Sequence, residues 1–307
     1  MFKHLLVPLD GSRLAESALP PAAYLAQTLG ARVTLIHVIE RAAPKEIHHQ
    51  RHLSQPEEAL QYLDEIAARA FPASVVVETH VHTSEVKDVA RSIVEHTGEL
   101  QPDLIVMCSH GSSGLRDRLY GSIAQQIIAA VRNTPWGNVP VFLARPGEQA
   151  PDLPFTLDKM LVPLDGNPEH EQGISVAAGL AQACKAALHL AMVVPTLGEL
   201  RGEQAASGRL LPGATAEMLD LAETGGQAYL QNLLPGLQAR GLVVSGEVGR
   251  GDPASTVAAI AESTGASLIV LGTHGKAGTD AFWSGSTTPK IASKTSIPLL
   301  LVPVHES

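Results

Sequence analysis

The sequence predicts an α/β protein that consists of two tandem doubly wound domains, each with a five-stranded, mainly parallel sheet flanked by helices. Short, continuous runs of Val, Ile and Leu, which are typical of strands buried on both faces, alternate with longer amphipathic stretches. This alternation favours right-handed crossover connections and a parallel sheet. The same series of segments occurs twice in the same order, which indicates a tandem duplication.

Four pairs of similar segments carry the repeat. The pairs are HLLVPLDGS (4–12) with KMLVPLDGN (159–167), ARVTLIHVIE (31–40) with AALHLAMVVP (186–195), LIVMCSHGSSGLRDRLYGSI (104–123) with LIVLGTHGKAGTDAFWSGST (268–287), and VPVFLARP (139–146) with IPLLLVPV (297–304). A link rich in Pro and acidic residues, 146–158, separates the copies. We therefore expect one domain over residues 1–147 and a second over residues 156–307.

The elements of the first half follow from these runs. The expected strands lie at residues 5–8, 33–39, 75–82, 104–108 and 141–144. Amphipathic stretches at 14–29, 57–70 and 85–97 are the expected helices, and 254–264 is one in the second half. A polar segment with several glycines, 197–217, is extra in the second half. We expect a surface loop there, and a lid over the ligand edge is the alternative.

The composition excludes several classes of protein. Apolar residues make up 45% of the 307 residues and charged residues 17%, so each half can bury a core. A formal charge of −9 argues against a general nucleic-acid binder. No apolar run approaches the roughly 18 residues that suggest a membrane span. Cys108 and Cys184 lie in different halves, and the N-terminus reads as a strand, so we expect reduced thiols and a cytoplasmic protein.

The glycine-containing segments indicate where a ligand binds. In an open parallel sheet, ligands bind at the carboxyl ends of the strands, where the strand order reverses. Gly272 and Gly275 allow the main chain to turn tightly beside a ligand, and Gly285 and Ser286 open a helix whose free amides suit a phosphate. Asp165 would lie across the cleft, near a ribose hydroxyl or a metal ion. The pattern therefore indicates a nucleotide.

The spacing G-x-x-G-x9-G-S in the second half resembles the ATP-binding motif of the universal stress protein family, and VPLDG is similar to the end of that family's first strand. The resemblance covers nearly the whole chain as two units. It implies an adenine nucleotide alpha hydrolase-like fold in each half and an ATP site in the second, with or without Mg²⁺. The nucleotide-binding residues that it implies there are Pro163, Asp165, Val193, Gly272, His274, Gly275, Gly285, Ser286 and Thr287.

The first half keeps a degenerate version of this site, because Cys108 stands where the second half has Gly272. The corresponding residues are Pro8, Asp10, Val38, Cys108, Gly111, Gly121 and Ser122. A Cys108 side chain in the core would narrow the site, and one in the cleft would compete with the nucleotide. Cys108 can be interpreted as a small buried hydrophobic residue or as a redox sensor. We expect weakened or absent binding in this half.

The resemblance implies a cytoplasmic protein that binds ATP in a regulatory or protective stress response. The two halves would pack on each other through their last strands as a pseudo-dimer, and further homo-oligomers and an unidentified protein partner stay open. The sequence assigns no catalytic residue, so any ATP hydrolysis should be slow. The alternatives are a nucleotide hydrolase or transferase that uses His274 and Asp165, and an interaction scaffold that binds no nucleotide.

Two further patterns are less specific. His48, His49 and His52 include an i,i+4 pair suited to zinc, but a third ligand is not evident, so we predict no metal site. The segment from Gly249 to Ala254 loosely matches a dinucleotide fingerprint. The first half has no glycine at that place, so a turn followed by a helix that starts at Pro253 is the better account.

Overall fold

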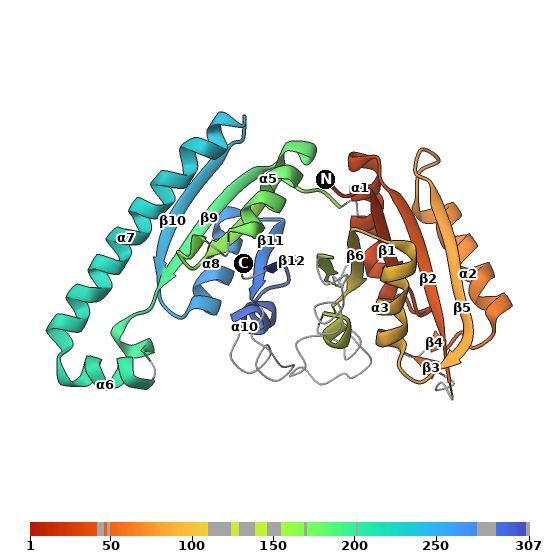
Figure 1. Cartoon of the computed structure of the whole chain (residues 1–307), viewed down its shortest axis with the longest axis horizontal. Coiled ribbons are helices and arrows are strands. Elements are labelled where there is room, and N and C mark those ends of the chain that lie inside the picture. The colour runs from red at the N-terminus through yellow and green to blue at the C-terminus, as the bar shows by residue number, and fades with distance from the viewer. Residues whose placement is uncertain are drawn as a thin grey trace. The chain divides into compact units, whose positions relative to one another are not determined.

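The chain forms two compact α/β units in the computed structural model (Figure 1). The structure describes residues 1–41, 46–47, 50–109, 124–128, 139–145, 155–168, 171–200, 202–274 and 287–304. Unit 1 comprises Met1–Thr156 and Pro298–Pro303, and unit 2 comprises Leu157–Ile297 and Val304–Ser307. The predicted α/β class, with sheets flanked by helices, is confirmed.

The sheet of unit 1 follows the strand order β12, β7, β6, β1, β2, β5. These strands are β1 (His4–Pro8), β2 (Arg32–Glu40), β5 (Val77–Val86), β6 (Leu104–Cys108), β7 (Val141–Ala144) and β12 (Leu299–Val304). The first five are mutually parallel, and β12 runs antiparallel to β7. The chain order reverses between β1 and β6, which is where an open parallel sheet binds its ligand.

The helices of unit 1 begin and end at local signals in the sequence. They are the 3-10 helix η1 (Ala15–Ala18), α1 (Leu19–Leu29), α2 (Pro56–Ala70) and α3 (Val89–Leu100). α1 ends at Gly30, whose φ of 61° is a left-handed conformation that glycine adopts without strain. Asp88 caps α3 by accepting a hydrogen bond from the backbone N–H of Arg91 at 2.9 Å. α2 packs along β5 and β2 (Figure 1). A short hairpin, β3 (Glu46–Ile47) and β4 (Gln50–Arg51), lies between β2 and α2.

Unit 2 repeats this plan with the strand order β10, β9, β8, β11. The strands are β8 (Lys159–Leu164), β9 (Ala187–Val194), β10 (Val244–Arg250) and β11 (Leu268–His274), and all neighbours are parallel. The helices are α5 (Gln172–Cys184), η3 (Leu197–Glu199), α6 (Gly202–Leu210), α7 (Pro212–Ala239), α8 (Pro253–Thr264) and α10 (Thr287–Lys294). The chain order reverses here between β8 and β11, which places the ligand edge at their carboxyl ends.

The prediction of a loop at 197–217 is wrong, although the segment is largely exposed, as expected. The segment forms η3, α6 and the start of α7, a helix of 28 residues that runs along β10 (Figure 1). α7 buries Leu219, Gly226, Leu230 and Leu237 against the unit, and it packs on β9 and β10. Because this packing is tertiary, it outweighs the low helix propensity of the glycines in the segment.

His4 on β1 couples the stability of unit 1 to pH. Its Nε2 lies 2.8 Å from the Thr34 hydroxyl, and the Arg32 guanidinium donates to its Nδ1 at 3.1 Å. Burial first, and the charge of Arg32 second, lower the pKa of His4 below its ordinary value. A lowered pKa means that the unfolded chain binds the proton more readily. The stabilisation is therefore complete above the ordinary value of about 6.5 and is lost as the pH falls below it.

We expect the thermal midpoint of unit 1 to fall between about pH 7.5 and about pH 5.5, and His4→Gln to reduce that fall. Burial also lowers the pKa of His52 and of His80 in this unit, so the variant should reduce the fall without removing it. The matched control is Lys159→Gln, at the equivalent position of β8. An equal fall in the wild type and in His4→Gln, followed by circular dichroism, would contradict the assignment.

Candidate functional site

Three predicted residues of unit 2 come together at the carboxyl edge of its sheet. β8 pairs with β11 through Leu161 and Ile269, and this parallel register, continued along the strands, places Gly272 level with Leu164, the residue before Asp165. β8 pairs with β9 through Leu164 and Met192, so Val193 lies at the same edge. Pro163 lies within β8, directly below that edge. The side chain of Asp165 is exposed, and its Oδ1 accepts from the backbone N–H of Asn167 at 3.0 Å.

The main chain at Gly272 is closely approached by α5. A Cβ placed on Gly173, in the first turn of that helix, would lie 3.6 Å from the Gly272 nitrogen. The helix and the end of β11 therefore approach each other through two residues without side chains. Gly272 thus has a packing role in addition to the expected ligand contact.

A pocket of about 240 Å³ opens at the same edge of unit 2. Its lining comes from the segment after β9, from the start of α8 and from the start of α10. The lining residues are Pro195, Glu199, Leu200, Asp252, Pro253, Ala254, Thr287 and Lys290. Thr287 is the predicted site residue among them. The other lining residues are not predicted from the sequence as site residues; the one local signal near them is the helix start predicted at Pro253.

Charge is unevenly distributed around this pocket. Glu199 and Asp252 contribute carboxylates, and Lys290 contributes a positive charge. The backbone N–H of Thr196 donates to Glu199 at 3.1 Å and its hydroxyl donates at 2.8 Å. These two hydrogen bonds hold the pKa of Glu199 below its ordinary value. The pocket therefore suits a neutral group with hydrogen-bond donors better than it suits a triphosphate.

Asp252 also holds the start of α8 in place, because its Oδ1 accepts from the backbone N–H of Ser255 at 3.0 Å. We expect Asp252→Ala to lower the free energy of unfolding by about 1 kcal/mol. Asp88→Ala, at the equivalent cap of α3 in unit 1, is the matched control and should cost a similar amount. Chemical denaturation followed by circular dichroism measures both. Of the two, only Asp252→Ala should alter ligand binding, and a change in binding for Asp88→Ala would refute this separation.

The equivalent edge of unit 1 is arranged differently. Leu6 pairs with Ile105, and this register, continued along the strands, places Cys108 level with Leu9, the residue before Asp10. Pro8 ends β1, and Val38 is buried within β2. Asp10 Oδ1 accepts from the backbone N–H of Ser12 at 2.9 Å and from its hydroxyl at 2.6 Å. The Asp10 carboxylate is therefore engaged in its own turn.

Cys108 is buried, with 9% of its surface exposed, and it pairs in register with Ala144 of β7. Little of the thiol therefore reaches the surface at the end of β6. Weakened nucleotide binding in this half stays a prediction. The glycines and serines of the loop that follows, Gly111, Gly121 and Ser122, lie outside the described residues, as do Gly275, Gly285 and Ser286 in unit 2. Only the backbone of His274, the last residue of β11, is described.

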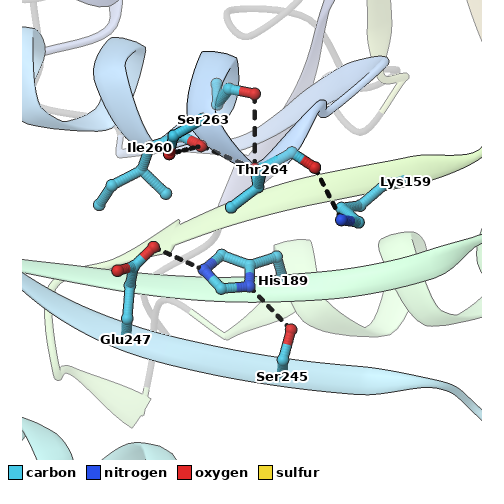
Figure 2. Close-up of polar contacts among 8 residues, drawn as sticks. Lys159, His189, Ser245, Glu247, Ile260, Ser263 and Thr264 are labelled. Carbon is cyan, nitrogen blue, oxygen red and sulfur yellow. Dashed lines mark hydrogen bonds and ion pairs between the residues drawn. The ribbon is translucent and has the colours of Figure 1, made fainter.

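A second polar cluster in unit 2 lies away from the ligand edge. His189 on β9 is 8% exposed; its Nδ1 lies 2.8 Å from the Ser245 hydroxyl and its Nε2 lies 3.0 Å from Glu247 Oε1 (Figure 2). His189 lies about 16 Å along the strand from the end of β9 at Val194, at ~3.3 Å per residue. The cluster supplies partners for a buried imidazole and does not reach the pocket.

The described residues contain neither a membrane-spanning helix nor a metal-binding cluster. No helix there is both long and apolar enough to cross a membrane. No group of three or more His, Cys, Asp or Glu side chains there is arranged to hold a metal ion. Of the three histidines considered for zinc, His48 and His49 lie outside the described residues.

Comparison with known proteins gives one consistent result. The sequence model of the universal stress protein family matches residues 1–133 and 156–303. A universal stress protein of Mycolicibacterium smegmatis is 27% identical over 316 residues, which covers 97% of this chain and 96% of the relative. Universal stress protein YxiE of Bacillus subtilis is 28% identical over 139 residues, or 41% of this chain and 92% of the relative. The crystal structure of a universal stress protein from Archaeoglobus fulgidus is 18% identical, with a TM-score of 0.68, over 99% of this chain and 97% of that one.

Proposed function

The chain belongs to the universal stress protein family, in a tandem arrangement, and from this premise we propose that it binds ATP, with or without Mg²⁺, at the carboxyl edge of unit 2. The observation that carries the proposal is the meeting of Asp165, Val193 and Gly272 at the ends of three adjacent parallel strands, beside a pocket that Thr287 borders. This is the place where an open α/β sheet binds its ligand.

The pocket suggests which part of the nucleotide lies where. Its volume of about 240 Å³ is below the 300–1,000 Å³ of typical complete ligand sites, so it takes one portion of the ligand. The carboxylates of Glu199 and Asp252 repel a triphosphate and accept hydrogen bonds from an amino group or from ribose hydroxyls. We therefore place the nucleoside in this pocket and the phosphates toward Gly272 and Thr287.

The biological role that fits such a site is regulation or protection in the cytoplasm during stress. Nucleotide occupancy would change the conformation of the chain or its choice of protein partner. We assign no catalytic residue, so ATP hydrolysis should be slow, well below the turnover of about one per second that is usual for enzymes.

Equilibrium dialysis of the purified full-length chain with ATP, together with a turnover assay, tests the proposal. We expect about one ATP bound per chain and almost no turnover. No binding by the wild type would remove the proposal and favour an interaction scaffold. Multiple turnover that is lost in His274→Ala, with binding retained, would instead favour the hydrolase or transferase.

A further inference from the structure

A segment of unit 1 lies over that unit's own ligand edge. Between β4 and α2 the chain passes through His52 and Leu53, which we call the strap. Leu53 packs on Gly11, the residue after Asp10. A Cβ placed on Gly11 would lie 2.8 Å from Leu53 Cδ1 and 2.9 Å from Leu53 Cγ. The strap therefore occupies the surface where the sequence predicts the nucleotide of this half.

His37 on β2 fastens the strap to the end of β1. The ring is buried, with 2% of its surface exposed. Its Nδ1 lies 2.8 Å from the carbonyl oxygen of Leu9, and its Nε2 lies 3.0 Å from the carbonyl oxygen of Leu53. Each carbonyl accepts a hydrogen bond from the ring nitrogen that it faces when that nitrogen carries a proton. One side chain thus bridges the strap and the strand that carries Asp10.

The closed position of the strap also has a cost. His52 is 7% exposed, and both of its ring nitrogens are buried without a hydrogen-bond partner in the described residues. Its ring centroid lies 6.4 Å from that of His37. Buried polar atoms that lose water without gaining a partner destabilise the arrangement that buries them. The contacts of His37 and Leu53 oppose this cost, so the strap depends on them.

Among the described residues of unit 2, no segment covers Gly166 in the way that Leu53 covers Gly11. In the aligned repeats Met192 stands in the place of His37, and Gly166 in the place of Gly11. Among the described residues, Met192 Cε lies 3.1 Å from a Cβ placed on Gly166. The chain after β9 continues into η3 and α6, and the pocket of about 240 Å³ is left open. The two halves therefore differ at one clamping residue and in the path of the following segment.

We propose that the strap is an autoinhibitory plug of unit 1, held by the bridge that His37 makes between Leu9 and Leu53, and that its release opens a second adenine nucleotide site in the chain. This inference rests on the proposed function, which is ATP binding at the carboxyl edge of the sheet. His37 acts as a positioning residue, since it touches the strap and not the nucleotide.

Trypsin cleavage after Arg51, next to the strap, tests the clamp without any nucleotide. His37→Met installs the residue that unit 2 carries. The neutral ring carries one N–H and so donates one of these hydrogen bonds at a time, and the loss of about 1 kcal/mol should speed this cleavage roughly five-fold if cleavage follows local opening. Met192→Leu in unit 2 is the matched control and should leave the rate unchanged. Leu53→Ala provides a second route to opening and retains the His37 side chain. An unchanged cleavage rate in both His37→Met and Leu53→Ala would overturn the clamp.

The number of ATP molecules bound per chain tests whether the strap blocks a nucleotide site in unit 1. The comparison is made in a Cys108→Gly background, which removes the other obstacle at this edge. We expect about one ATP per chain for Cys108→Gly and about two for Cys108→Gly with His37→Met. A value that stays at one, with faster cleavage, would overturn the plug while leaving the proposed function intact. If no variant binds ATP, and the wild type does not either, the proposed function and the plug are both refuted. The cleavage rates would still show whether His37 holds the strap in place.

Discussion

Gly272→Val is expected to weaken ATP binding by unit 2 roughly 10- to 100-fold, the effect of adding a branched side chain to a closely packed place. The first turn of α5 reaches the main chain of Gly272, as shown by the 3.6 Å between its nitrogen and a Cβ placed on Gly173. We expect the added side chain to crowd the contact between α5 and the end of β11, at the edge where ATP binding is proposed. Isothermal titration calorimetry with ATP measures the loss.

Cys108→Val is the matched control for this variant. It places the same valine side chain at the equivalent position of unit 1, where a side chain is already accommodated and 9% exposed. We expect an unchanged affinity and stoichiometry of ATP for Cys108→Val. If Gly272→Val binds ATP as tightly as the wild type, ATP binding does not depend on this part of the carboxyl edge of unit 2.

Phe142→Ala is expected to lower the free energy of unfolding of unit 1 by about 3–5 kcal/mol, because it removes a large buried side chain. Phe142 is 1% exposed on β7, and its ring meets the ring of Phe155 edge-on, with centroids 5.9 Å apart. It also pairs in register with Leu300 of β12. The cavity would therefore lie in the core of the sheet, between parts of the chain that are distant in sequence.

Chemical denaturation measures this effect, and Val76→Ala is the control. Val76 is 63% exposed in the same unit, so its truncation should change the free energy of unfolding by less than about 0.5 kcal/mol. A loss below about 1 kcal/mol for Phe142→Ala would mean that the core around β7 collapses into the cavity and that this packing contributes little.

Much of the fold follows from the sequence because strands and repeats leave local signals. β1, β2, β6 and β7 lie within a few residues of the apolar runs that predict them. α8 begins at Pro253, as the turn reading predicts. By contrast, β5 begins at Val77 and continues to Val86, where the sequence suggests a helix from residue 85. The pairing of β5 with β2 decides that boundary, and pairing is a contact between distant residues.

Some residues of the candidate site could likewise be predicted from the sequence, and others could not. Asp165, Val193 and Gly272 could be predicted because each ends a strand that the repeat identifies, and parallel strands bring their ends to one edge. Glu199, Leu200 and Lys290 could not, since they border the pocket only after η3, α8 and α10 have packed together. Nothing in the local sequence of these residues indicates a ligand.

The sequence by itself determined the duplication, the α/β class, the family and the strand ends at which a nucleotide is expected. Those features depend on periodicity and spacing, which are properties of neighbouring residues. Only the tertiary structure decided that 197–217 is helical and that Leu53 covers Gly11 under the bridge of His37. The physical reason is that burial against β9 and β10 stabilises α7, and contacts between distant residues hold the strap.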